Sequence, residues 1–236
     1  MEQRAGGSRI VDFDLEKQTV RELNQYLHKE LPKNGVEEVR IFNPDGAHHI
    51  AVGMDAPAKV DIMGNAGYFV AGMNKHAEVT VRGSVGWSVA ENIMSGTVRV
   101  EGYASECAGA SGRGGLLVIE KDASSRCGIS MKGNDIVVGG SVGHFSAFMA
   151  QAGRLVVCGD AGDGLGDSLY EAVIYVRGEM KGLGADAREE PTTEEDHASL
   201  AGLLERAGFD HDTEEFKRVA SARSLYHWNA DRDQGY

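Results

Sequence analysis

The chain has 236 residues, a formal net charge of −12, and 32 glycines beside only four prolines. So acidic a chain disfavours nucleic acid and anionic membranes as partners, because those surfaces select for basic patches. The large excess of glycine over proline is not the composition of a disordered segment, so the glycines must have a structural purpose.

Two further features exclude classes of protein. Residues 1–8 contain no charged-then-apolar leader and no apolar run approaches the length of a membrane span, so we expect a cytoplasmic protein without a membrane anchor. Cys107, Cys127 and Cys158 form no CxxC pair and are odd in number. This argues against a disulfide framework or a zinc site and favours small buried thiols.

Residues 1–45 predict an α/β cap. Ile10 and Phe13 suggest a short extended piece, and 19-TVRE-22 is a capping box that begins a helix ended by 32-PKNG-35. The segment 36-VEEVRIF-42 then returns as a strand. Such a cap is needed because an open stack of strands polymerises at its exposed edge.

A 19-residue repeat occupies the middle of the chain. It recurs seven times without an insertion, in 59-KVDIMG-64, 78-EVTVRG-83, 97-TVRVEG-102, 116-LLVIEK-121, 135-DIVVGG-140, 154-RLVVCG-159 and 173-VIYVRG-178. A strict period of this kind is typical of repeat architectures, in which each unit packs on its neighbours.

Branched aliphatic residues fill two columns of this repeat. One contains Val60, Val79, Val98, Leu117, Ile136, Leu155 and Ile174, and the other contains Ile62, Val81, Val100, Ile119, Val138, Val157 and Val176. A third column admits only small residues: Ala71, Ala90, Gly109, Gly128, Ala147, Gly166 and Ala185. Apolar residues two apart predict a strand with one buried face. The sequence therefore predicts an all-β core, a right-handed parallel β-helix of about seven coils over residues 46–186.

The coil 103–121 is irregular. It has Lys121 where other coils end in glycine, and Ser105 where four other coils have glycine. We expect a distortion or a docking surface in this coil and the next, with ordinary drift among repeats as the alternative.

Residues 187–236 predict a helical and aromatic tail. An acidic boundary leads into an amphipathic helix over 192–208, and a second helix is expected from Asp212, with Glu215 in its first turn. The last twelve residues carry Tyr226, Trp228 and Tyr236. These aromatic residues either pack on the β-helix or insert into a partner, and we favour the partner.

The loop 159-GDAGDGLGD-167 is the most suggestive motif of the sequence. The next strand follows it instead of a helix, so it lacks the helix N-terminus that holds phosphate. Its aspartates occur once, whereas calcium-binding β-helices repeat them every nine residues. We interpret Asp160, Asp163 and Asp167 as a corner that faces a partner or solvent. No catalytic, cofactor-binding or metal-binding residue can be singled out.

The repeat unit resembles the GXGXG domain, the C-terminal β-helix of the glutamate synthase large subunit. The residues that carry this are 83-GSVGWSVAENIMSGTVRVEG-102, 140-GSVGHFSAFMAQAGRLVVCG-159 and 159-GDAGDGLGDSLYEAVIYVRG-178. The whole chain, including 20-VRELNQYLH-28 and 216-FKRVASARSLYHW-228, is similar to the small β-helix subunit of the N-methylglutamate synthase family (methylamine–glutamate N-methyltransferase), in which this domain is a separate chain.

That resemblance implies a scaffold subunit with no cofactor or catalytic residue of its own. The implied partners are a class II glutamine amidotransferase-like subunit and a flavin-dependent glutamate synthase-like subunit that holds FMN, with or without an iron–sulfur cluster. Two alternatives stay open. One is the β-helix subunit of formylmethanofuran dehydrogenase or of the related formyltransferase/hydrolase complex, which shares the repeat. The other is a carbohydrate-active β-helix with Glu91, Glu106 and Asp163 on one face.

Overall fold

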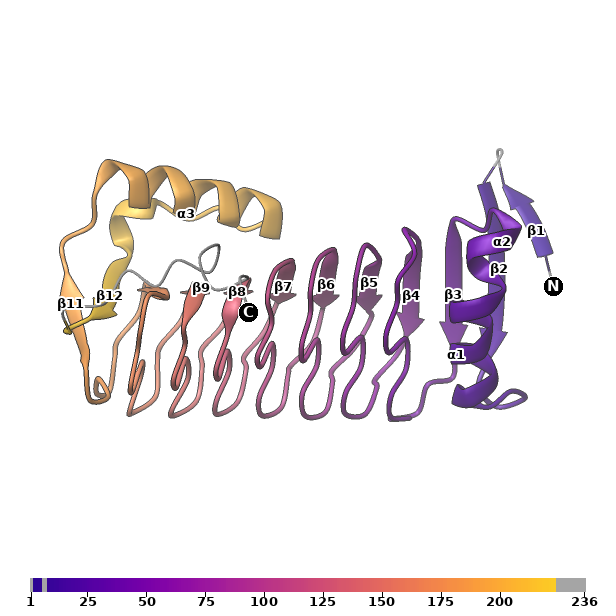
Figure 1. The fold of residues 1–236 in the computed structure, drawn as a ribbon, viewed down its shortest axis with the longest axis horizontal. Helices are drawn as coiled ribbons and strands as arrows, with labels where there is room; N and C mark the ends of the chain where they lie inside the picture. The colour runs from indigo at the N-terminus through magenta and orange to yellow at the C-terminus, as the bar shows by residue number, and fades with distance from the viewer. Residues whose placement is uncertain (1, 6–7, 224–236) are drawn as a thin grey trace, which may run out of the picture.

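Seven parallel strands, one from each coil, form the body of the molecule (Figure 1). The computed structural model describes residues 2–5 and 8–223. The strands are β4 (Lys59–Met63), β5 (Glu78–Val81), β6 (Thr97–Val100), β7 (Leu116–Ile119), β8 (Lys132–Val138), β9 (Ala152–Val157) and β10 (Val173–Val176). Val60 pairs with Val79, Val79 with Val98, and so on to Ile174, always 19 residues apart. The predicted parallel β-helix is confirmed.

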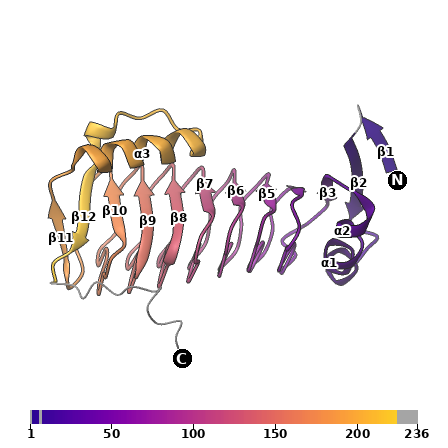
Figure 2. The same cartoon turned by 45° about the horizontal axis from the view of Figure 1, so that its top comes forward.

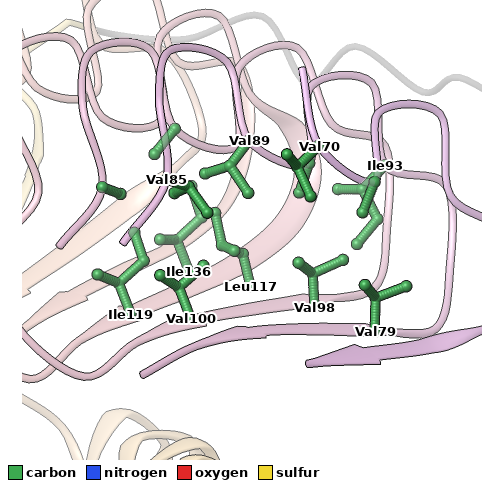
Figure 3. Packing of buried hydrophobic residues seen from close by; sticks show 14 of the residues in the cluster. Val70, Val79, Val85, Val89, Ile93, Val98, Val100, Leu117, Ile119 and Ile136 are labelled. Atoms are coloured by element: carbon green, nitrogen blue, oxygen red, sulfur yellow. The ribbon is translucent and has the colours of Figure 1, made fainter. Parts of the chain in front are cut away.

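The two aliphatic columns form the core. All fourteen of their residues are at most 1% exposed. Figure 3 shows part of this core, with Val79, Val98 and Leu117 contributed by successive strands. Burying one such side chain contributes roughly 1.5–3 kcal/mol, so each coil adds a similar stabilising increment through its two column residues.

The small-residue column lies in the turn opposite the strands. Its first six members have left-handed φ angles, from 52° at Ala71 to 70° at Gly128, whereas Ala185 in the last coil is exposed and outside the pattern. A Cβ on Gly109 would lie 2.5 Å from the Ile136 side chain. The column is therefore restricted to small residues by both backbone conformation and lack of space.

The N-terminal cap contains the predicted strand, helix and strand, together with two short elements that the sequence did not predict. The predicted ones are β2 (Ser8–Asp14), α1 (Val20–Lys29) and β3 (Glu38–Phe42), and the additional ones are β1 (Glu2–Ala5) and α2 (Leu31–Asn34). The Thr19–Glu22 capping box is present, and β3 pairs in parallel with β4. Asn24 of α1 donates to the His49 carbonyl at 2.7 Å and accepts from the Ala51 amide at 3.0 Å, which fixes α1 against the first turn of the β-helix.

The C-terminal cap confirms one predicted helix and corrects the other. Its elements are β11 (Ala187–Glu190), α3 (Glu194–Ala207), the 3₁₀ helix η1 (Thr213–Glu215) and β12 (Lys217–Ser221). The second helix predicted from Asp212 is wrong, because only η1 forms before the chain becomes a strand. β12 pairs antiparallel with β10 and with β11. The open edge of β10 offers unpaired amides and carbonyls, and that tertiary pairing outweighs the local helix signal.

One twelve-stranded sheet runs through both caps. The domain boundaries predicted after residues 45 and 186 fall between β3 and β4 and just before β11. They stay a prediction, since the sheet crosses both. Within residues 2–5 and 8–223, we find no helix with the length and apolar character that a membrane crossing requires.

We predict that Val138→Asp destabilises the protein by at least about 3 kcal/mol, because it leaves an unpaired charge inside a closed coil. Thermal or urea unfolding measures this. Thr80→Asp, at a half-exposed outward position of β5, is the matched control and should unfold close to wild type. Near-wild-type unfolding of Val138→Asp would contradict the inward assignment of that column.

Candidate functional site: outer surfaces of the β-helix

The outward column of the strands changes character halfway along the β-helix. It reads Asp61, Thr80 and Arg99, then Val118, Val137, Val156 and Tyr175. In the first half the outward side chains form ion pairs along the axis, with Arg82 bound to Asp61 and Glu101 and Arg99 bound to Glu120. In the second half they form an apolar face.

Helix α3 covers that apolar face (Figure 2). Leu200, Leu203, Leu204 and Ala207 of α3 pack with Leu116, Val118, Val137, Val156 and Tyr175 in one buried cluster. The irregular coil 103–121 and the next are thus part of a docking surface, and its occupant among the described residues is the chain's own helix. The sequence contained the signal, because the outward column turns apolar at Val118, and Leu116, two residues before it, is apolar as well.

A polar network fixes the N-terminal end of α3. The Tyr175 hydroxyl donates to Asp196 Oδ1 at 2.6 Å, Arg218 Nε donates to the same oxygen at 3.1 Å, and Arg218 also pairs with Glu190. Burial and the Asp196 carboxylate raise the pKa of Tyr175. Burial raises the pKa of Asp196, but hydrogen bonds from Tyr175 and Thr193 and the charge of Arg218 together lower it to about 2.

A pocket of about 480 Å³ lies beside this network. Arg154 and Arg218 line it, but Arg154 binds Asp135 through two hydrogen bonds of 2.7 Å and Arg218 is held by Asp196 and Glu190. Because both guanidinium groups are neutralised by carboxylates, the pocket does not favour an anionic ligand. We assign the network to the attachment of α3.

We predict that the Asp196 network makes stability fall in acid. A carboxyl group whose pKa is lower in the folded state stabilises the fold above its unfolded pKa of 3.8, and the stabilisation is lost as pH falls towards 2. Asp196→Asn should remove about 2 kcal/mol at pH 7 and flatten the decline between pH 5 and pH 2. Urea unfolding against pH measures this. The exposed Glu205→Gln is the control, and equal pH profiles for wild type and Asp196→Asn would contradict the prediction.

A ladder of side-chain to backbone hydrogen bonds explains part of the Asp-Gly loop. In five coils, the side chain of the residue after the coil end accepts a hydrogen bond from the amide of the equivalent residue in the next coil. The accepting side chains are Asn65, Ser84, Asp122, Ser141 and Asp160, at 2.8–3.1 Å. Asp160 accepts from Glu179, and Asp167 accepts from the Ala185 amide at 3.1 Å. Two of the three aspartates therefore hold the last coils together.

The third aspartate and the tail complete the predicted interface residues. Asp163 is exposed and lies against Gly182, where a Cβ would be 2.2 Å from its Oδ1. Contact of Asp160, Asp163 and Asp167 with a partner stays a prediction, and Tyr226, Trp228 and Tyr236 lie outside the described residues. Across 2–5 and 8–223, no three His, Cys, Asp or Glu side chains are grouped so that they could hold a metal ion.

The cysteines are free thiols. Cys127 and Cys158 are buried, and burial raises their pKa to about 12 and about 11. Cys107 is partly exposed, and burial together with Glu106 raises its pKa as well. A raised pKa keeps a thiol protonated and weakly nucleophilic, and the two buried thiols contribute to packing.

Comparison with known proteins finds similarity to a curated protein in sequence and to a solved complex in structure. The chain is 55% identical over 225 residues to Protein GlxC of Rhizobium meliloti (strain 1021), covering 95% of this chain and 99% of that protein. A chain of the crystal structure of the formyltransferase/hydrolase complex (FhcABCD) from Methylorubrum extorquens in complex with methylofuran matches with a TM-score of 0.57. That match has 18% identity, covers 89% of this chain and 88% of the other, and shows the fold alone. No family model matches.

Proposed function

Because the chain belongs to the GlxC family, we propose that it and its relatives are non-catalytic β-helix subunits of a glutamate synthase-like complex. The observation that carries this proposal is the 19-residue repeat of the glutamate synthase type, which runs in register from β4 to β10. Its most conspicuous polar groups, the aspartates and arginines described above, are used to join coils and to attach α3. A rigid rod of this kind suits a spacer between two active sites.

In this complex the chain holds a class II amidotransferase-like subunit and a flavin-dependent synthase-like subunit, the latter with FMN, at a fixed separation. Seven coils at about 4.8 Å each make a rod of roughly 30–35 Å. The finer form of the proposal is N-methylglutamate synthase, which converts methylamine and glutamate to N-methylglutamate and ammonia. It is supported by the sequence resemblance of the whole chain to the small subunit of that family.

The structural neighbour favours a second candidate, a subunit of a formyltransferase/hydrolase complex. We rank it lower because its identity to this chain is 18%, against 55% for GlxC. The carbohydrate-active alternative loses support from spacing. Glu106 and Asp163 occupy equivalent positions three coils apart, which is about 14 Å, whereas paired glycosidase carboxylates lie about 5–9.5 Å apart.

Co-expression of the chain with an amidotransferase-like and a flavin-dependent synthase-like subunit tests the proposal. We expect one stoichiometric assembly on size-exclusion chromatography, with FMN in the synthase-like subunit and N-methylglutamate formed only by the assembly. Turnover of methylamine by the isolated chain would contradict the non-catalytic role, and failure to assemble with either subunit would contradict the scaffold role.

A further inference from the structure

Exposed apolar side chains are concentrated in the first coils. Eight large apolar side chains of the described residues are at least 42% exposed, and six of them lie between Met63 and Tyr103. The three aromatic ones in that span are Tyr68 at 44%, Trp87 at 62% and Tyr103 at 56%. Each follows the strand of its coil, one in each of three successive coils: Tyr68 and Trp87 begin the turn, and Tyr103 precedes it. We call these three residues the aromatic side.

Backbone hydrogen bonds place the aromatic side on adjoining coils. The Phe69 amide donates to the Trp87 carbonyl at 2.7 Å, and the Val85 amide donates to the Tyr103 carbonyl at 2.8 Å. His48 extends the surface towards the N-terminal cap, because its ring stacks on Tyr68 with 3.6 Å between centroids. The three exposed aromatic residues therefore lie on adjoining coils, and His48 packs on the first of them.

The same positions are polar in the later coils. The column of Tyr68 and Trp87 continues as Glu106, Ser125, His144 and Asp163. Tyr103 lies in a column that is otherwise polar, with Asn65 and Ser84 before it and Asp122, Ser141 and Asp160 after it. The outward side chains of the strands change in the opposite direction: they are polar in the first coils and apolar in the later coils, where α3 covers them. Helix α3 covers the outer apolar face of the later coils, whereas none of the described residues covers the aromatic side.

Charge identifies the kind of occupant. Glu106 is next to Trp87 in its column and Glu91 lies in the adjoining turn, and neither forms an ion pair within the described part of the chain. A second copy related by a twofold axis would bring Glu106 close to Glu106, which costs free energy. The chain's own residues 224–236 contain two aspartates and one arginine, so they do not supply a basic surface either.

The geometry points to the aromatic side as the site where this chain binds another subunit of its complex, through an apolar pocket on that subunit rimmed by lysine or arginine. This inference rests on the proposed scaffold function and adds the surface and the chemistry of the partner. Tryptophan and tyrosine are the residues that most often dominate interface energies, and exposed apolar patches of monomers mark such interfaces. Trp87 is the expected anchor.

The test uses the co-expressed assembly. Trp87→Ala should weaken binding of one subunit at least about tenfold and leave the other subunit bound. Met149→Ala, which removes a 49% exposed side chain from a later coil, is the matched control and should bind normally. Glu106→Lys should also weaken the same contact, and added salt should weaken it in wild type but less in Glu106→Lys. Far-UV circular dichroism and melting verify that each variant is folded.

The outcomes separate this inference from the proposed function. If wild type assembles and Trp87→Ala assembles with equal affinity, the aromatic side is not the interface although the scaffold role stands. If wild type binds neither subunit, both fail. The chain has two tryptophans, Trp87 and Trp228. Trp87 is therefore the only source of tryptophan fluorescence both in Trp228→Phe and in a chain that ends at Arg223. If the fluorescence emission spectra of these two chains differ, residues 224–236 occupy the aromatic side and the inference is wrong. If wild type is a dimer that Trp87→Ala dissociates, a second copy occupies it and the inference is wrong as well.

Discussion

The in-register stacking of 19-residue coils is the constraint on which the rest of the structure depends. Because each strand residue pairs with the residue 19 positions later, each inward position of the repeat meets a similar environment in successive coils. Inward columns must be aliphatic, the left-handed turn position must be small, and the position after a coil end offers an oxygen for the next amide in five coils. One inserted residue would move a whole face outward.

A rod built in this way has two problems, its open ends and its outer surface. The ends are closed by β2, β3 and α1 on one side and by β12 and β11 on the other. The outer surface then becomes the variable part, since the core does not restrict it. Here the second half is used to bind α3, and the first half presents the aromatic side.

Most of the β-helix could be predicted from sequence because it is periodic, and repetition turns weak local preferences into a strong signal. The capping boxes at Thr19 and Thr193 were predictable for a different reason, because each is complete within four consecutive residues. Strand β12 could not be predicted in this way, because its pairing partner β10 is more than about forty residues away in the sequence. The local sequence contains only the helix-start signal of Asp212 and Glu215. The roles of Asp160 and Asp167 were missed because their partners are amides of the next coil, although the recurrence of Asn, Ser and Asp in that column was visible.

Hydrogen–deuterium exchange of the chain, alone and in the co-expressed assembly, tests the central claim that the coils supply a rigid rod whose outer sides bind the partners. The account predicts slow exchange of the strand amides in both states, with added protection on assembly over residues 63–106. Fast exchange of the strand amides in the isolated chain, or added protection confined to residues 159–167, would contradict it.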